Sequence, residues 1–335
     1  MSDVVPPQAG DRITLAGSDV AIPPLGVGTW AWGDKSTWGM GGYDASLTEA
    51  SIRQAWEASI DAGVVLFDTA EVYGGGESER IIGRLLAADP AVRPRVVIAT
   101  KFMPSPWRIP MKSSLVAAAR ASCERLGIDS IDLYQIHGPI SLRSQGTLAD
   151  ALATARAEGL VKAVGVSNYS VKEMRAMDAA LRQRDLRLAT NQIEFSLLRA
   201  KPERVGLLGC CAELGVIPLA YSPIGQGRLT GKYSAQNPPP GKRNFSAYPM
   251  AEVDTLVAEM RRIGEAHGGR TPSQVGLAWI VAKGAVPIPG AKNQDQAEQN
   301  AGALGWRMSE GEVARLDGLA RFGKGGLNSF FWQHG

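Results

Sequence analysis

The chain is poor in the residues that build disulfide frameworks and metal sites. Its 335 residues include three cysteines and three histidines. The cysteines are odd in number and lack CxxC spacing, and the vicinal pair Cys210 and Cys211 has a strained geometry for a disulfide. The sequence therefore predicts neither a disulfide framework nor a bound metal ion.

An excess of charge of one sign is also lacking. Thirty-six basic side chains oppose 33 acidic ones, giving a net charge of +3 at pH 7. Because the chain has no run of five or six like charges, binding to nucleic acid or to a membrane surface is not expected. No apolar run approaches 18 residues, and residues 1–12 contain two aspartates and no apolar core. We therefore expect no membrane span and no secretory signal, and a cytoplasmic location.

What the sequence does contain is a regular alternation of apolar runs and amphipathic stretches. The runs are rich in valine, isoleucine and leucine, which is typical of parallel strands covered on both faces. The alternation itself is typical of consecutive strand–helix units. Eight runs are expected to be strands, at residues 25–30, 64–68, 95–101, 131–137, 161–166, 188–194, 216–221 and 286–289.

The stretches between these runs have features typical of helices. Ile52, Trp56 and Ile60 recur at intervals of four residues, which marks one helical face. A glycine, the residue that best adopts the left-handed conformation after a helix, follows several of these stretches. These glycines are Gly63, Gly127, Gly159, Gly215 and Gly284.

Eight strand–helix units in one chain of this length predict an α/β fold, the (β/α)8 or TIM barrel. We expect one barrel domain over residues 1–335. Three segments fall outside the repeat: an N-terminal β-hairpin at residues 13–22, a long insertion between the last two strands at residues 225–250, and a C-terminal tail at residues 322–335.

Ionisable residues end three consecutive apolar runs. Asp68, Lys101 and His137 stand at these positions, and Tyr73 follows Asp68 by five residues, close enough to curl back over the strand ends. Because the C-terminal ends of all strands of such a barrel share one mouth, the four side chains are expected to converge there. Each alone has an ordinary alternative, such as a helix cap for Asp68 or a core position for His137. Their conjunction predicts an active site.

Together the four side chains can donate a proton to a carbonyl group. A tyrosine has an ordinary pKa of about 10, and a neighbouring ammonium is expected to lower the pKa of Tyr73 toward the working pH. Tyr73 would then be the general acid, while Asp68 keeps Lys101 charged and oriented. His137 would donate a hydrogen bond to the carbonyl oxygen and orient the substrate.

The four side chains supply no electrons, so a reducing cofactor is needed. Neither GxGxxG after a predicted strand nor GxxxxGK[ST] is present, which disfavours the usual dinucleotide and nucleotide loops. The later strands end in segments rich in amides, glycine and Tyr221, which suit a carboxamide, a phosphate and a flat heterocycle respectively. Lys232, Arg243 and Lys292 add positive charge nearby, with solvated surface positions as the alternative.

The sequence resembles the aldo-keto reductase superfamily. The resemblance rests on the segments LGVGTWAWG, FDTAEVYGGGESE, IATKF, IDLYQIHGP, KAVGVSNYS, NQIEFSLL, AYSPIGQGRLTGKY and PIPGAKNQDQAEQN. Their order and spacing are most similar to the branch with bacterial reductases, plant chloroplast reductases and pyridoxal reductase-like proteins. The lack of a transit segment points to a bacterial or cytosolic member.

This resemblance implies an NADPH-dependent reductase that converts an aldehyde or ketone to an alcohol. The partner is thus a small carbonyl compound, and the residues matching the family's catalytic tetrad are Asp68, Tyr73, Lys101 and His137. Many relatives have arginine where Lys292 stands, and lysine lacks the planar fork that binds a phosphate through two hydrogen bonds. NADPH (NADP+) is the expected cofactor, and NADH is expected to bind with lower affinity.

The resemblance also implies a cofactor site, partly covered by the insertion at residues 225–250. Ser167, Asn168 and Gln192 would hold the nicotinamide carboxamide, with Tyr221 stacked on the ring. The residues implied along the pyrophosphate are Ser222, Pro223, Ile224, Gln226, Gly227 and Leu229, with Lys232 and Arg243 reaching phosphates. Those implied at the adenosine end are Gly290, Lys292, Gln296 and Asn300. The expected cofactor contacts further include Gly28, Thr29, Trp30, Asp68 and Pro289.

Aromatic residues near the mouth predict a site for flat or bulky apolar carbonyl compounds. Trp30 and Trp107 are expected to touch substrate together with Tyr73 and His137, with core packing as the alternative for the tryptophans. The terminal residues Phe330 to Trp332 are a further candidate, with structural docking or disorder as alternatives.

Two other functions remain open at this point. A desolvated Lys101 is a possible nucleophile of a Schiff-base aldolase, although Asp68 would keep its amine protonated. The chain also resembles, within the same superfamily, the potassium-channel β proteins, which share the barrel and the cofactor and act as nucleotide-sensing regulatory subunits.

Overall fold

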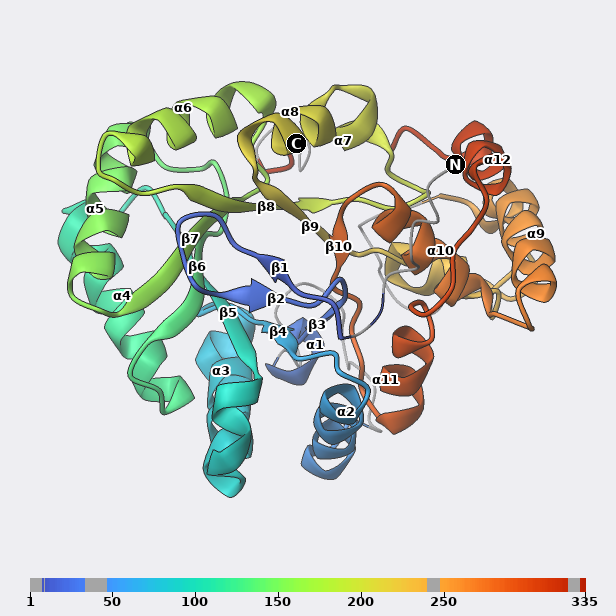
Figure 1. The fold of residues 1–335 in the computed structure, drawn as a ribbon, viewed down its shortest axis with the longest axis horizontal. Helices are drawn as coiled ribbons and strands as arrows, with labels where there is room; N and C mark the ends of the chain where they lie inside the picture. Colours follow the sequence, from blue (N-terminus) through green and yellow to red (C-terminus); the bar gives the residue numbers. More distant parts are fainter. Residues whose placement is uncertain (1–7, 9, 34–46, 240–247, 325–331) are drawn as a thin grey trace.

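Eight parallel strands close into a barrel in the computed structural model (Figure 1). The structure describes residues 8, 10–33, 47–239, 248–324 and 332–335. Each strand pairs with the next one along the chain, and the ring is completed between the first and last strands. There Gly28 N donates to Pro289 O at 2.9 Å, beside a parallel bridge between Gly28 and Gly290. The predicted (β/α)8 barrel is confirmed.

The strands lie within or close to the eight apolar runs. They are β3 (Gly26–Gly28), β4 (Leu66–Asp68), β5 (Val97–Phe102), β6 (Ile131–Ile136), β7 (Val161–Ser167), β8 (Leu188–Glu194), β9 (Ile217–Tyr221) and β10 (Val286–Pro287). The first run was expected to extend to Trp30, but that residue begins a short helix, α1 (Trp30–Gly33). Gly28 permits the closure of the ring, because a β-carbon there would lie 2.8 Å from Ile288 O.

The N-terminal hairpin covers one end of the barrel. Its strands β1 (Ile13–Thr14) and β2 (Ala21–Ile22) pair antiparallel, as expected, and Figure 1 shows them lying across the barrel. Leu15 and Ile22 are fully buried in one cluster with strand residues that include Leu66 and Ala99. Because side chains alternate along a strand, the residues two positions further on face the same interior, nearer the other end. Those residues are Asp68 and Lys101.

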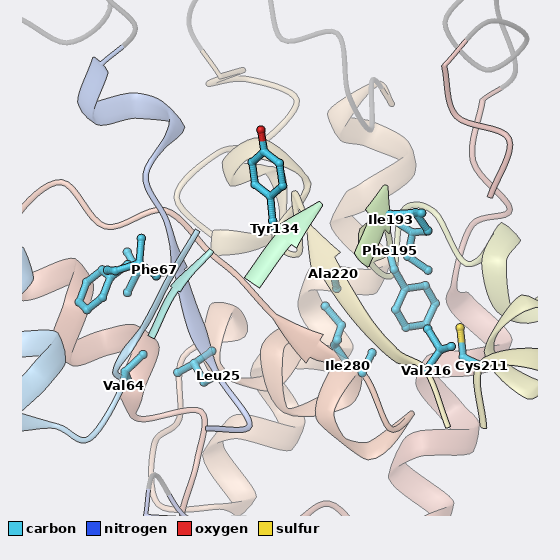
Figure 2. Close-up of a cluster of buried hydrophobic side chains, with 14 of the residues drawn as sticks. Leu25, Val64, Phe67, Tyr134, Ile193, Phe195, Cys211, Val216, Ala220 and Ile280 are labelled. Atoms are coloured by element: carbon cyan, nitrogen blue, oxygen red, sulfur yellow. The ribbon is translucent and has the colours of Figure 1, made fainter. Parts of the chain in front are cut away.

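Amphipathic helices surround the barrel and bury its outer surface. Phe67 of β4 packs on Trp56, at 4.1 Å between ring centroids, and Figure 2 shows further members of this layer such as Phe195 and Val216. The helices are α2 (Glu49–Asp61), α3 (Glu77–Ala88), α4 (Met111–Leu126), α5 (Gln145–Ala157), α6 (Val171–Arg182), α7 (Lys201–Arg204), α8 (Leu207–Leu214), α9 (Met250–Ala266), α10 (Pro272–Ala282), α11 (Gln294–Ala301) and α12 (Glu310–Leu319). Gly127 ends α4 in the predicted left-handed conformation, with φ at 65°.

Shorter 3-10 segments connect these elements, and the expected insertion and tail are described in part. The segments are η1 (Tyr73–Gly76), η2 (Pro90–Arg95) and η3 (Gly225–Thr230). Residues 240–247 and 325–331 lie outside the described residues, and with them Arg243, Phe330 and Phe331. Within the described ranges, no helix has the length and apolarity needed to cross a membrane.

Candidate active site

The structure brings the four predicted catalytic side chains together at the C-terminal end of the barrel. Asp68 ends β4, Lys101 lies near the end of β5, and His137 follows β6. Lys101 Nζ lies 2.5 Å from Asp68 Oδ1 and 3.3 Å from the Tyr73 hydroxyl, and the Tyr73 and His137 rings meet edge to face at 5.7 Å. The convergence expected from three consecutive strand ends is therefore present.

A glycine turn positions Tyr73. The residue begins η1, and Gly74 and Gly75 follow it with positive φ angles of 59° and 62°. A β-carbon on Gly74 would lie 1.9 Å from Gly33 O, so only glycine lets η1 approach α1 this closely. The turn thereby directs the Tyr73 side chain toward Lys101.

Lys101 is fully buried, and its ammonium is fully hydrogen bonded. Its three donors point at Asp68 Oδ1 at 2.5 Å, Thr69 O at 2.8 Å and Tyr73 OH at 3.3 Å. Burial disfavours the ammonium, but Asp68 and Tyr73 outweigh this effect and raise the pKa of Lys101 above its ordinary value. The side chain is therefore a fixed cation directed at the phenol oxygen.

The electrostatics of Tyr73 differ from the prediction. Its pKa is raised, because burial of the phenol and the Asp68 charge together outweigh the lowering effect of Lys101. Lys101 acts in the expected direction through its charge and its hydrogen bond, but it does not bring the pKa below 10. Tyr73 consequently remains a protonated phenol at neutral pH, which is the form that can donate a proton.

His137 is buried and neutral. Burial, followed by the charge of Lys101, holds its pKa well below the usual 6.5. Its Nδ1 atom is buried without a hydrogen-bond partner in the described part of the chain. A neutral imidazole has one N–H donor, so His137 can donate a single hydrogen bond to an incoming oxygen atom.

Two buried amides reach the other oxygen of Asp68. Gln192 Nε2 lies 2.7 Å and Gln135 Nε2 lies 3.3 Å from Asp68 Oδ2. Gln192 was expected near the nicotinamide, whereas Gln135 was missed. The signal was present, since Gln135 lies midway between Leu133 and His137 at the period of two that defines one face of a strand.

Side chains from three neighbouring strands form a polar wall beside the tetrad. Ser167 Oγ donates to Gln192 O at 2.9 Å, and Asn168 Nδ2 donates to Ser167 Oγ at 3.1 Å. The Tyr221 hydroxyl donates to Asn168 Oδ1 at 2.9 Å. The structure thus joins the four residues expected around the nicotinamide into one hydrogen-bonded group, which contacts Asp68 through Gln192.

The segment after β9 folds into consecutive tight turns. Left-handed backbone recurs at Ser222, Gly225, Gln226 and Gly227, with φ angles from 49° to 93°. Such turns form concave backbone surfaces that suit anions. Of the other residues expected along the pyrophosphate, Pro223 and Ile224 belong to this segment, whereas Leu229 is fully buried and packs in the core.

The adenosine end predicted from the sequence is a loop tied down on several sides. Gly290 O accepts from Asn300 Nδ2 at 3.2 Å, and Lys292 N donates to Gln296 Oε1 at 3.1 Å. Trp32 Nε1 donates to Ala291 O at 2.7 Å. Lys292 therefore stands on a well-supported loop, just before the first turn of α11. Lys232 is exposed, and its Nζ lies 5.8 Å from the Tyr233 ring centroid.

Several other residues expected at the site make hydrogen bonds within the barrel, and the two tryptophans differ in exposure. The Thr29 hydroxyl donates to Asp68 O at 2.9 Å and lies 2.8 Å from Ser78 Oγ, so it is committed to the backbone beneath the site. Gly28 and Pro289 close the barrel. Trp30 is half-buried in α1, and Trp107 is 80% exposed, so the structure does not pack Trp107 on the tetrad.

The C-terminal residues provide the aromatic side chain that Trp107 does not. Trp332 packs edge to face on His137 at 5.4 Å between ring centroids. A β-carbon on Gly138 would lie 2.7 Å from the Trp332 ring, so glycine at this position admits the indole. Gln333 Nε2 donates to Tyr221 OH at 3.1 Å, which anchors this tail beside the predicted nicotinamide wall.

The donor set fits a nicotinamide dinucleotide. Its amides, an aromatic ring, concave backbone turns and a supported lysine follow one another along the strand ends from β7 to β10. Across the described ranges, no cluster of three or more His, Cys, Asp or Glu side chains could hold a metal ion.

Comparisons with known proteins agree with this geometry. A model of the aldo/keto reductase family matches residues 24–321. Chloroplastic pyridoxal reductase from Arabidopsis thaliana is 36% identical over 313 residues, which cover 90% of this chain and 84% of that protein. The 6-dehydroglucose reductase of Novosphingobium aromaticivorans is 33% identical, covering 91% of this chain and 93% of that protein. A crystal structure of an aldo-keto reductase from Klebsiella pneumoniae in complex with NADPH has a TM-score of 0.73 and 26% identity, covering 96% of each chain.

Proposed function

Because the chain belongs to the aldo/keto reductase family and is an NADP-dependent oxidoreductase, we propose that it reduces an aldehyde or ketone with Tyr73 as proton donor. The observation that carries the proposal is the buried Asp68–Lys101 pair with its ammonium directed at the Tyr73 hydroxyl. When bound, NADPH supplies the hydride that reduces the carbonyl carbon.

The side chains of the tetrad supply the proton, stabilise the charge that forms and orient the carbonyl group. Tyr73 donates its phenolic proton to the carbonyl oxygen, and the fixed charge of Lys101 stabilises the phenolate that forms. Asp68 holds that ammonium in place. The neutral His137 donates a hydrogen bond to the same oxygen and so orients the carbonyl group.

The lowered pKa of His137 predicts how the rate of carbonyl reduction depends on pH. Because its pKa lies well below 6.5, the imidazole stays neutral as the pH falls from 8 to 6. We therefore expect kcat/KM for carbonyl reduction to show no loss with a midpoint near 6.5. Initial rates measured across this range, corrected for acid decay of NADPH, test the expectation. A titration near 6.5 that disappears in His137→Gln would contradict it.

We further propose that the cofactor binds along the strand ends from β7 to β10. Ser167, Asn168 and Gln192 would hold the carboxamide and Tyr221 would stack on the ring. The turns after β9, at Ser222, Pro223, Ile224, Gln226 and Gly227, would cradle the pyrophosphate, with Lys232 and Arg243 reaching phosphates. Gly290, Lys292, Gln296 and Asn300 would bind the adenosine end, where Lys292 favours the additional phosphate of NADPH.

Lys292→Ala is expected to raise the NADPH dissociation constant by about ten- to a hundredfold, because a charge-assisted phosphate contact is lost. The NADH value should barely change, since NADH lacks that phosphate. Fluorescence titration with both cofactors measures the effect, and Lys112→Ala, a change of equal charge at an exposed position of α4, is the control. An equal loss of affinity for NADPH and NADH would mean that Lys292 contacts the shared pyrophosphate or only supports its loop.

The substrate is proposed to be a flat or bulky apolar carbonyl compound. The Trp332 indole beside His137 supports this class, together with the half-buried Trp30. Two relatives are named for ring compounds, pyridoxal and a dehydroglucose, although both of these carry hydroxyl groups. Trp107, which is exposed, remains a candidate for contact with the substrate.

A screen of aldehydes, ketones, quinones, pyridoxal and oxidised sugars, with NADPH absorbance as readout, tests the proposed function. Steady turnover with ring-containing carbonyl compounds, and poor turnover with short aliphatic ones, is the expected result. Tight retention of NADPH without turnover of any compound would instead support a nucleotide-sensing regulatory subunit.

The aldolase alternative has little support in the structure. A Schiff base needs a free amine with a lone pair, whereas every N–H donor of Lys101 already has an acceptor and Asp68 lies 2.5 Å away. Trapping of a carbonyl compound on Lys101 by borohydride would reverse this conclusion.

A further inference from the structure

Asp68 Oδ2 accepts hydrogen bonds from two amide side chains, of which one is also proposed to bind the cofactor. Gln192 Nε2 lies closer, at 2.7 Å, and belongs to the wall proposed to bind the nicotinamide carboxamide. Gln135 Nε2 lies at 3.3 Å, beneath that wall. All three side chains are buried, so a hydrogen bond lost from Asp68 is not replaced by bulk water.

A hydrogen bond to the amide oxygen of Gln135 fixes the direction of its amide group. Thr190 Oγ1 donates to Gln135 Oε1 at 3.1 Å, so the amide nitrogen of Gln135 faces Asp68. Gly165 makes room for the pair, because a β-carbon there would lie 2.1 Å from Thr190 Oγ1 and 3.1 Å from Gln135 Cγ. Gln135 has no comparable route to the cofactor, since both ends of its amide are already engaged within the barrel.

We propose that Gln135 is a positioning residue that keeps Asp68 hydrogen bonded when Gln192 turns to the nicotinamide carboxamide. The inference rests on the proposed cofactor site. Without Gln135, binding of the cofactor would draw away the one other amide that donates to Asp68 Oδ2 among the described residues, and the carboxylate would be free to rotate away from Lys101. With Gln135, Oδ1 continues to face Lys101 Nζ while Gln192 changes partner.

A double-mutant cycle on NADPH affinity tests this role. Methionine matches glutamine in length and lacks the amide, so the cycle uses Gln135→Met, Gln192→Met and the double variant. Gln135→Met alone is expected to raise the NADPH dissociation constant by about tenfold or more, because hydrogen bonds to charged groups are among the stronger ones. In the Gln192→Met background the same change should have almost no effect, because Gln192 is no longer there to change partner.

The cycle separates positioning from simple support of the fold. A structural role would lower the melting temperature of the cofactor-free protein and weaken NADPH binding equally in both backgrounds, and that outcome would overturn the proposal. Thr190→Val leaves Gln135 in place but removes the group that orients it, so it should show the same coupling to Gln192 with a smaller magnitude. It also provides the test if Gln135→Met does not fold.

The wild-type protein distinguishes failure of this inference from failure of the proposed function. If the wild type binds NADPH and reduces carbonyl compounds but the cycle shows no coupling, the role of Gln135 alone is wrong. If the wild type binds no NADPH, the proposed function and this inference both fall.

Discussion

Tyr73→Phe is expected to lower kcat for carbonyl reduction by about 10²- to 10⁴-fold, because it removes the positioned general acid. The same hydroxyl is one of three acceptors of the Lys101 ammonium, which keeps the other two at Asp68 and Thr69. The ring would keep its edge-to-face contact with His137, and the backbone N–H of residue 73 would still donate to Ala70 O. The position of the side chain is therefore preserved. The NADPH dissociation constant should be nearly unchanged. Single-turnover rates and a fluorescence titration on the same preparation give both quantities.

Tyr134→Phe is a matched control for this substitution. Tyr134 lies on β6, is fully buried, and its hydroxyl finds no hydrogen-bond partner in the described part of the chain. Removal of that hydroxyl should leave kcat unchanged and the melting temperature unchanged or slightly raised, since no satisfied polar group is lost. A wild-type rate from Tyr73→Phe would remove Tyr73 from its proposed role.

Lys101→Met is expected to be comparably damaging to turnover, for an electrostatic reason. The charge and the hydrogen bond of Lys101 are the two influences that lower the pKa of Tyr73, so their removal raises that pKa further. Alcohol oxidation, the reverse reaction, needs the phenolate and therefore speeds up as the pH rises through this pKa. In Lys101→Met the rise should shift to a higher pH than in the wild type. A pH profile of alcohol oxidation measures this shift.

The same substitution should also destabilise the fold, because it leaves the carboxylate of Asp68 buried without its ion partner. Breaking a buried pair in this way costs about 3–5 kcal/mol. The double variant Asp68→Asn with Lys101→Met removes both charges and should recover most of the stability without recovering turnover. Denaturant unfolding of the three proteins separates the two effects. Recovery of turnover in the double variant would mean that Lys101 acts only by neutralising Asp68.

The barrel and the tetrad were predictable because both follow from short-range patterns. Apolar runs at regular spacing predict parallel strands, and parallel strands place their last residues at one end. Asp68, Lys101 and His137 therefore had to be neighbours once the runs were assigned to one barrel. The boundary at Trp30 was less predictable, because an apolar residue at the end of a run can equally begin a helix.

The features that sequence reasoning missed depend on tertiary surroundings. The raised pKa of Tyr73 follows from the depth at which η1 places the phenol, which no local pattern encodes. Trp332 packs on His137 whereas Trp107 is exposed, because loops and chain ends are placed by contacts, such as the clearance at Gly138, rather than by periodicity. Gln135 belonged to a visible inward face, but its partner Thr190 comes from a strand 55 residues away.

Isotope transfer tests the central claim most directly, namely that this protein reduces a carbonyl carbon with hydride from NADPH while Tyr73 supplies the proton. The reaction is run with NADPH deuterated at both C4 positions and a substrate found in the carbonyl screen, and the alcohol is analysed by mass spectrometry and NMR. We predict one deuterium on the carbinol carbon for each NADPH consumed, at a rate that Tyr73→Phe lowers without changing the position of the label. An alcohol without deuterium at that carbon, or labelled alcohol formed equally fast by Tyr73→Phe, would contradict the account.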